Sequence, residues 1–388
     1  MDFAPANEHP LDPFSQYGRM REAAPVYHDE QTGSWHVFRY DDVQQVLSEH
    51  ARFSSRMGGD DPSETGQLFA SSLITTDPPR HRQLRSLVTQ AFTPKAVDAL
   101  APRISELTDE LLKEIASRGS ADLIEALAYP LPVIVISELM GIPADDRDRF
   151  KQWSDVIVSQ TRTGAATQDQ HKTNQEMTGY FLELIEQRRS RPGDDLISNL
   201  LAAEIDGQKL NVAELLGFCA LLLVAGNETT TNLIGNAVLC FTEVPGTVER
   251  IVNEPSLLPQ AIEEVLRFRS PVQSMYRVTV ADTTLGGVQI PAGAPVVAWI
   301  GSANRDERQF ERAAQFDVDR GQIRHLAFGH GIHFCLGAPL ARLEAKIALE
   351  AVLSRLPGLS LATGSQLERM DSTIVYGLKS LPVSWNAA

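Results

Sequence analysis

Residues 327–342 read AFGHGIHFCLGAPLAR and surround one cysteine with glycines. Gly329, Gly331 and Gly337 indicate a backbone that adopts positive φ or approaches another group closely. Cys335 lies just before a predicted helix, where N–H groups and the helix dipole favour a thiolate over a thiol. A thiolate is a nucleophile or a metal ligand, although a cysteine among glycines is also often a small buried residue.

The segment FGHGIHFCLG resembles the haem-binding loop of the cytochrome P-450 family, F-G-x-G-x-H/R-x-C-x-G, at every fixed position. The resemblance, to the soluble bacterial type, covers essentially the whole chain. It implies that Cys335 is the thiolate ligand of the iron of haem b, with Phe328 and Gly337 also in contact with this cofactor. It further implies a mainly α fold with minor β-sheets, in a single domain over residues 1–388. The haem would lie between a long central helix and the cysteine loop.

A second stretch, LLLVAGNETTTN at 221–232, interrupts an apolar run with an acid, amides and hydroxyls. Buried polar groups are unfavourable unless they are satisfied. AGNETT resembles the family motif A/G-G-x-D/E-T-T on the helix that crosses the distal side of the haem. The resemblance implies that Ala225 and Gly226 lie beside the haem, and that Glu228 and Thr229 are catalytic and guide protons to dioxygen. The alternative is a satisfied polar network between helices that binds no ligand.

Basic residues at four positions match the propionate-binding positions of the family. His81 and Arg85 are four residues apart, so on a helix both project from one face and can hold a carboxylate. Arg277 and His333 are the other two matches. Taken alone, the first pair would equally suit a solvated basic face.

Glu264 and Arg267, in EEVLR, resemble the family's E-x-x-R, whose spacing permits an ion pair on one helix face. In the family an arginine ahead of the cysteine loop joins this pair, and Arg320 is the best match. We therefore expect these three residues to hold the fold near the haem and to take no part in the chemistry.

Composition and charge narrow the class of protein. The chain has 388 residues and a formal net charge of −15, which argues against general nucleic-acid binding. Its three cysteines form no C-x-x-C pair, which favours a reducing, cytoplasmic setting over a disulfide framework. The N-terminus does not resemble a signal peptide, and no apolar run approaches the length that spans a bilayer, so we expect no membrane partner.

Helical periodicity dominates from His81 onward, and a long helix is predicted from Asn211, an N-cap with Glu214 three residues on, to Pro245. An early strand (SWHVFRY), a short helix (DDVQQVLSEH) and glycine-linked strands between residues 276 and 299 complete the prediction. The other predicted helices cover 96–118, 129–140, 145–159, 175–190, 255–271 and 338–356.

The resemblance implies a monooxygenase that inserts one atom of dioxygen into a small hydrophobic substrate by hydroxylation or epoxidation. The chain has no room for a fused reductase, so a ferredoxin or flavodoxin with its reductase would supply electrons from NAD(P)H. A hydrogen-peroxide-dependent peroxygenase and a non-catalytic haem-binding module are the alternatives, although relatives of the first kind typically lack the acid–alcohol pair. A cysteine hydrolase is a weaker alternative, because His333 is too near Cys335 in sequence to imply a catalytic pair.

Two surfaces follow from the resemblance. An acidic redox partner would need a local basic patch, which we expect from Arg80, Arg82, Arg342 and Lys346. An apolar substrate cavity would be lined by parts of several segments. These are residues 57–74, the polar segment after Val158, Val224–Ala225, Val272–Met275 and Ile374–Val375.

Overall fold

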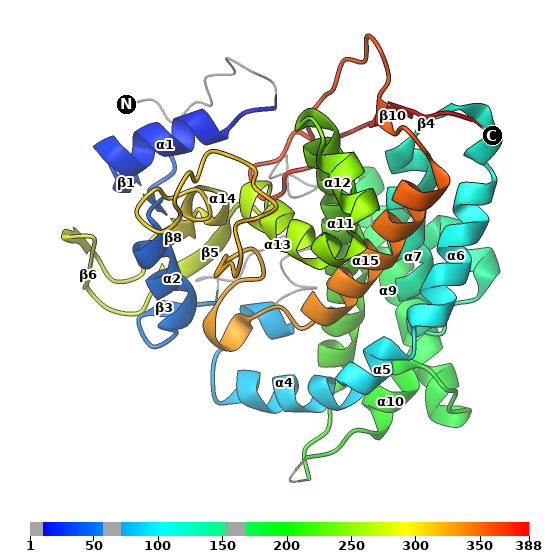
Figure 1. Ribbon diagram of the computed structural model, residues 1–388. Coiled ribbons are helices and arrows are strands. Elements are labelled where there is room, and N and C mark those ends of the chain that lie inside the picture. Colours follow the sequence, from blue (N-terminus) through cyan, green and yellow to red (C-terminus); the bar gives the residue numbers. More distant parts are fainter. Residues whose placement is uncertain (1–10, 57–70, 151, 154–167, 206, 388) are drawn as a thin grey trace. The chain divides into compact units, whose positions relative to one another are not determined.

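The structure, a computed structural model, describes residues 11–56, 71–150, 152–153, 168–205 and 207–387 (Figure 1). Contacts within the chain group it into two compact units. The first comprises Met1–Ser54, Ala101–Tyr129 and Thr229–Ala388, and the second Ser55–Leu100 and Pro130–Glu228. The single domain over residues 1–388 stays a prediction.

The first unit contains a five-stranded sheet in the order β1-β2-β8-β5-β3. Strands β2 and β8 pair in parallel, and the other neighbours are antiparallel. The strands are β1 (Val26–Asp29), β2 (Ser34–Val37), β8 (Pro295–Ala298), β5 (Met275–Thr279) and β3 (Phe53–Ser54). Buried residues of this sheet share one apolar cluster with helices α2 (Tyr40–Ser48) and α14 (Ile300–Ala303). The predicted strand SWHVFRY and helix DDVQQVLSEH are confirmed in β2 and α2.

Smaller sheets complete the β part of the same unit. A hairpin joins β6 (Thr283–Leu285) to β7 (Val288–Ile290) through Gly286 and Gly287, which both have positive φ, so the predicted glycine turn is confirmed. The third sheet has the order β4-β10-β9. Its strands are β4 (Ser120–Asp122), β10 (Pro382–Ser384) and β9 (Ser360–Leu361).

Helix α15 (Ala338–Arg355) packs against α6 (Ala101–Lys113) and α13 (Leu258–Phe268) in the first unit (Figure 1). The buried residues of α13 recur at helical spacing, so one face of this helix joins the core. The remaining elements of this unit are α1 (Phe14–Ala23), α12 (Thr247–Asn253), η2 (Ala116–Arg118), the π-helical η3 (Ile124–Ala128), η5 (Pro255–Leu257) and η6 (Gly331–His333).

The second unit is helical. Its described elements are η1 (Leu73–Thr75), α4 (Arg80–Ala91), α5 (Pro94–Asp98), α7 (Pro130–Leu139), η4 (Ala144–Asp146), α9 (Gln168–Ser190), α10 (Leu196–Ala202) and the first part of α11. The predicted helices 129–140 and 175–190 are confirmed in α7 and α9, the latter beginning earlier, at Gln168.

The long helix is confirmed in α11 (Val212–Glu243). Its predicted start is also confirmed, because the Asn211 side chain accepts from the Glu214 N–H and Glu214 accepts from the Asn211 N–H, both at 2.9 Å. In the described part of the chain, α11 is long and apolar enough to cross a membrane by length and composition. The core helix of a soluble protein passes the same test, and Phe218, Leu223 and Leu239 of α11 are buried.

The prediction of one continuous helix over residues 96–118 is wrong. The chain instead forms α5, α6 and η2. Pro102 lies in the first turn of α6, where its missing N–H is tolerated, whereas a helix running through it from Ala96 would lose a hydrogen bond and meet a steric clash. The predicted helix 145–159 lies mostly outside the described residues.

Candidate active site

The cysteine loop of the first unit contains η6 and leads into α15. Gly329 and Gly331 have φ values of 73° and 71°, in the left-handed region that glycine tolerates best. A Cβ at Gly331 would lie 2.8 Å from Cα of Ser48, so the loop approaches α2 more closely than a side chain would allow. The Cys335 N–H donates to the Phe328 carbonyl at 2.8 Å and closes the loop.

Cys335 is the accessible thiol of this chain. All three cysteines are described, none forms a disulfide, and Cys335 is exposed whereas Cys219 and Cys240 are buried. Burial raises the pKa of Cys219 to about 12 and raises that of Cys240 as well, which keeps both as thiols. A Cβ at Gly337 would lie 4.0 Å from Sγ of Cys335, so this glycine lies beside the sulfur.

The predicted ion pair of Glu264 and Arg267, joined by Arg320, is confirmed. Arg267 donates to both oxygens of Glu264 at 2.7 Å, and Arg320 Nε donates to them at 3.0 and 3.1 Å. The side chains of Glu264 and Arg267 are fully buried. Arg267 also donates to the carbonyls of Asn304, Ala313 and Gln315. The network therefore ties α13 to the segment that leads into the cysteine loop.

On α11 the helix continues without interruption through the polar stretch. In the second unit, Ala225 is exposed although it lies in mid-helix. A Cβ at Gly226 would lie 3.2 Å from Cδ1 of Ile136, so this glycine allows α7 to pack closely on α11. Glu228 and Thr229 follow as half-buried side chains on either side of the division between the units.

The four basic residues predicted for the propionates lie on three kinds of element. In the second unit, His81 is buried in the first turn of α4 and Arg85 is half-buried one turn later. In the first unit, Arg277 of β5 is 5% exposed and donates to the Tyr276 carbonyl at 2.7 Å. His333 ends η6 inside the cysteine loop.

The segments predicted to line the substrate cavity are brought together in part. Val272 pairs with Val375 in a β-bridge, and the Gln273 N–H donates to the Ile374 carbonyl at 2.7 Å. Val224 and Ala225 belong to the second unit. Residues 57–70 and 154–167, which include most of the first two segments predicted to line the cavity, lie outside the described residues.

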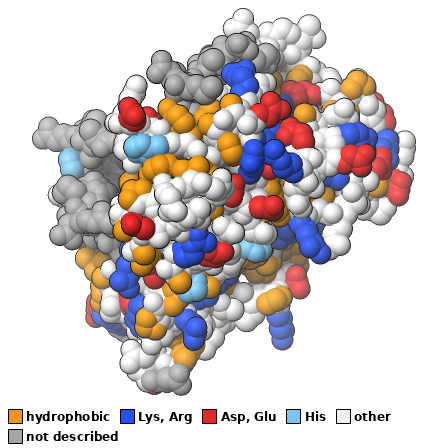
Figure 2. All heavy atoms as spheres, turned by 90° about the vertical axis from the view of Figure 1, so that its left-hand side faces the viewer, with side chains coloured by type: hydrophobic (Ala, Val, Ile, Leu, Met, Phe, Trp, Pro, Cys, Tyr) orange, Lys and Arg blue, Asp and Glu red, His pale blue; other side chains and the backbone are white. Residues whose placement is uncertain are grey.

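The predicted basic patch contains cations that already have acidic partners. Arg80 binds Glu214 at 2.6 Å, Arg342 binds Glu263 at 2.7 Å, and Lys346 lies 3.5 Å from Glu350. Figure 2 shows a face on which basic and acidic side chains are likewise interspersed. The patch is therefore weaker than the sequence predicts, because paired charges largely cancel beyond a few ångströms.

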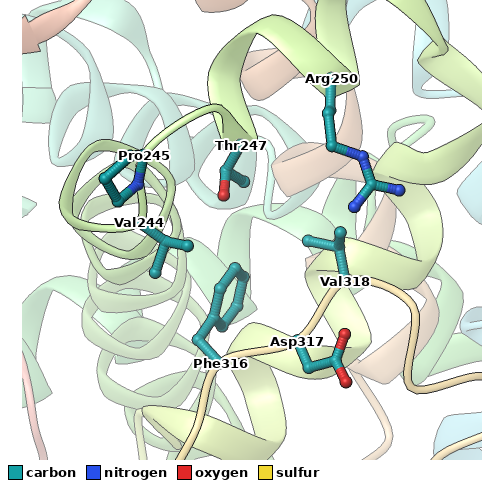
Figure 3. A pocket seen from close by; sticks show the side chains of 7 residues that line it. All are labelled: Val244, Pro245, Thr247, Arg250, Phe316, Asp317 and Val318. Atoms are coloured by element: carbon teal, nitrogen blue, oxygen red, sulfur yellow. The ribbon is translucent and has the colours of Figure 1, made fainter.

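A surface pocket of about 190 Å³ in the first unit lies where α11 ends and α12 begins. Figure 3 shows the Phe316 ring directed into it, with Arg250 and Asp317 at its rim. Arg250 is paired with Asp319, and Asp317 with Arg312. This pocket contains none of the predicted site residues, and each of its two charged side chains is paired with a residue outside its lining.

Comparison with known proteins decides the family. The Cytochrome P-450 family profile matches residues 7–386. The chain belongs to the cytochrome P-450 family. A putative cytochrome P-450 of Bacillus subtilis is 46% identical over 377 residues, which are 96% of this chain and 93% of that protein. The erythromycin C-12 hydroxylase of Saccharopolyspora erythraea is 41% identical over 375 residues, 94% and 92% of the two chains. A Bacillus megaterium cytochrome P-450 in complex with testosterone has a TM-score of 0.88 and 47% identity, with 97% and 99% covered.

The predicted cytochrome P-450 fold and enzyme class are thereby confirmed. The chain is a monooxygenase, an oxidoreductase that incorporates oxygen from dioxygen into a small substrate, and its family implies a haem. The residues fit that group. Among the described residues no three or more of His, Cys, Asp and Glu gather as a metal site, whereas haem iron needs only a thiolate from the protein side of the cysteine loop. Cys335 offers an accessible sulfur for it.

Sequence reasoning missed one part of this cytochrome P-450. Glu263, the first acid of EEVLR, contacts both His325, three residues before Phe328, and Arg342. The only signals in the sequence were the first glutamate of the EE pair, at residue 263, and the histidine at residue 325, ahead of the cysteine motif. Helix and strand periodicity relates residues only a few positions apart, so it could not predict a contact between residues 62 apart.

Proposed function

We propose that the enzyme binds haem b through the thiolate of Cys335. The observation that carries this proposal is the one accessible thiol, on a loop closed by a 2.8 Å bond from the Cys335 N–H to the Phe328 carbonyl. Bound haem supplies the redox chemistry that activates dioxygen, and a thiolate ligand favours cleavage of the O–O bond. Phe328 and Gly337 belong to the same loop and contact the cofactor in this proposal.

The remaining contacts with haem follow from charge and size. His81 and Arg85 of α4, with Arg277 and His333 of the first unit, bind the two propionates through charge-assisted hydrogen bonds. Ala225 and Gly226 are small, and Ala225 is exposed in mid-helix, which supports a close approach of α11 to the flat face of the cofactor.

Glu228 and Thr229 deliver protons during dioxygen activation in this proposal. Both are half-buried neighbours on α11, so one can exchange protons with solvent while the other holds a proton donor at the active site. Replacing Thr229 with Ala should divert NAD(P)H consumption from product to hydrogen peroxide by about 10²-fold or more in the product-to-peroxide ratio. Equal coupling in the variant and the wild type would reject the role.

Separate proteins supply the electrons in this proposal. A ferredoxin or flavodoxin, with a reductase that draws on NAD(P)H, transfers two electrons for each turnover. A reducing cytoplasm suits both these partners and the exposed thiol of Cys335, which forms no disulfide. Product formation driven by NAD(P)H and such partners, exceeding that driven by hydrogen peroxide alone, is the expected result. The reverse would favour a peroxygenase.

The substrate is a compact apolar molecule of the size of a steroid or a macrolide. Relatives support this class, since one is in complex with testosterone and another is an erythromycin C-12 hydroxylase. The contact between Val272–Met275 and Ile374–Val375 gives one apolar wall to such a site. A panel of steroids and macrolides, scored by the haem spin-state change, tests the class.

The ligation itself is tested by reducing the haem-loaded protein and adding carbon monoxide. A strongly red-shifted Soret band in the wild type, lost in Cys335→Ser, is the expected result. A wild-type band at the position typical of a neutral ligand would overturn the assignment of Cys335.

A further inference from the structure

A cluster of three polar residues lies at the base of the cysteine loop. Arg342 of α15 donates to both oxygens of Glu263 of α13, from Nε at 2.7 Å and from Nη2 at 2.8 Å. His325 Nε2 lies 3.1 Å from the second of these oxygens. The side chain of His325 is 4% exposed, and that of Glu263 is 29% exposed. One carboxylate therefore joins two helices to the segment that enters the loop.

The hydrogen bonds fix the tautomer of His325. The Ala327 N–H donates to His325 Nδ1 at 3.2 Å, so Nδ1 is an acceptor. A neutral imidazole then carries its proton on Nε2 and donates it to Glu263. Burial alone would raise the pKa of Glu263, but the bonds from Arg342 and His325 lower it to about 2, so Glu263 is a stable anion. The carboxylate thus orients the imidazole, and the imidazole holds the backbone of Ala327.

Arg342 also contacts Phe328, the residue after Ala327. Its guanidinium carbon lies 4.5 Å from the centre of the Phe328 ring, within the range of a cation–π contact. The ring of Phe328 also lies 6.0 Å from that of His325. Since the Phe328 carbonyl accepts from the Cys335 N–H, a chain of contacts runs from Glu263 to the cysteine.

We propose that Glu263, His325 and Arg342 are positioning residues that hold Phe328, and through it Cys335, in the geometry that keeps the sulfur bound as a thiolate. Arg342 accordingly serves the ligand loop and is not a docking residue for the electron donor. This inference rests on the proposed role of Cys335 as the haem ligand.

The decisive variant is Arg342→Lys in the full-length, haem-loaded protein. Lysine keeps the positive charge that docking would need, but it lacks the planar fork that binds Glu263 twice and covers Phe328. The matched control is Lys346→Gln, which removes a cation one helical turn later on α15, where its partner is Glu350. Glu263→Gln, with Glu350→Gln as its control, is the second pair. Ferric–ferrous midpoint potentials and reduced carbon monoxide spectra are recorded for all of them.

We expect Arg342→Lys and Glu263→Gln to lower the ratio of red-shifted to neutral-ligand Soret band by about tenfold, as for the loss of one charge-assisted hydrogen bond, and to shift the potential. Both controls should match the wild type. A wild-type spectrum and potential in Arg342→Lys would overturn the proposal. If Glu263→Gln fails to fold, Arg342→Lys still decides.

A second measurement separates this proposal from the proposed function. In the haem-free full chain, Cys335 is the accessible thiol, so its rate of reaction with a disulfide reagent reports the order of the loop. Arg342→Lys should react several-fold faster than Lys346→Gln. Equal rates would count against the positioning role even with normal ligation in the wild type. A wild type without a thiolate-type spectrum would instead remove the haem assignment.

Discussion

The substitution Glu264→Gln isolates the contribution of a buried anion to the segment that carries the cysteine loop. Glu264 accepts five hydrogen bonds: two from Arg267 at 2.7 Å, two from Arg320 at 3.0 and 3.1 Å, and one from the Asp317 N–H at 3.0 Å. A glutamine amide can replace only one carboxylate oxygen as an acceptor. In the orientation that loses fewer hydrogen bonds, the NH₂ group replaces Oε2 and faces the N–H groups of Arg267 Nε and Arg320 Nε, from which it cannot accept hydrogen bonds. The buried guanidinium of Arg267 also loses its counter-charge.

Breaking a buried pair in this way lowers the free energy of unfolding by about 3–5 kcal/mol. The control is Asp319→Asn, because Asp319 also takes two bonds, both of 2.8 Å, from one arginine, Arg250, but at the surface. Urea unfolding followed by circular dichroism should show a clear loss for Glu264→Gln and a curve close to the wild type for Asp319→Asn. A loss below about 1 kcal/mol for Glu264→Gln would mean that the backbone carbonyls around Arg267 suffice, and the reasoning would be wrong.

Three further predictions concern pH and the loop backbone. Burial raises the pKa of Glu344 from 4.5 to about 8, and no described residue hydrogen-bonds its Oε2. The folded state then holds a proton that the unfolded chain releases, so wild-type stability should fall as the pH rises from 4.5 to about 8. Because Glu344→Gln cannot titrate, its free energy of unfolding relative to that of the wild type should rise by at least about 1 kcal/mol over that pH range. Parallel pH profiles would contradict this. Burial lowers the pKa of His36 from 6.5, against the opposite effect of Asp29, and its Nδ1 accepts from Trp299 Nε1 at 3.0 Å. The unfolded chain takes up the proton first, so stability should drop as the pH falls below 6.5, with a change in Trp299 fluorescence, and His36→Gln should flatten this slope. Gly331→Ala should reduce haem content and thermal stability more than Gly329→Ala. Both have positive φ, but the Cβ at Gly331 would clash with the Ser48 backbone at 2.8 Å, whereas the Cβ at Gly329 would lie 3.6 Å from the His333 carbonyl, an ordinary contact. Backbone strain at positive φ alone destabilises each variant by about 1–3 kcal/mol. Equal losses of stability in the two variants would therefore show that α2 shifts to accommodate the methyl group.

Local signals predicted the features whose causes are local. Asn211 and Glu214 interact within one turn, which is why the start of α11 could be located from the sequence. Gly286 and Gly287 determine a two-residue turn by their own backbone freedom. Pro102 is an equally local signal, because proline favours the first turn of a helix; the predicted helix over 96–118 was wrong, and α6 begins at Ala101.

The sequence by itself determined the family and the mainly α class, because the residues of each motif are adjacent along the chain and lie within one loop or on one helix face. Only the tertiary structure decided which partners those motifs acquire. Arg320 reaches Glu264 from 56 residues away, and Glu263 meets Arg342 across 79 residues. Such contacts depend on how helices and loops pack, and the same packing pairs Arg80 and Arg342 of the expected docking patch with Glu214 and Glu263. A charge in a sequence has no fixed neighbour until the chain folds, so its role is decided by the packing.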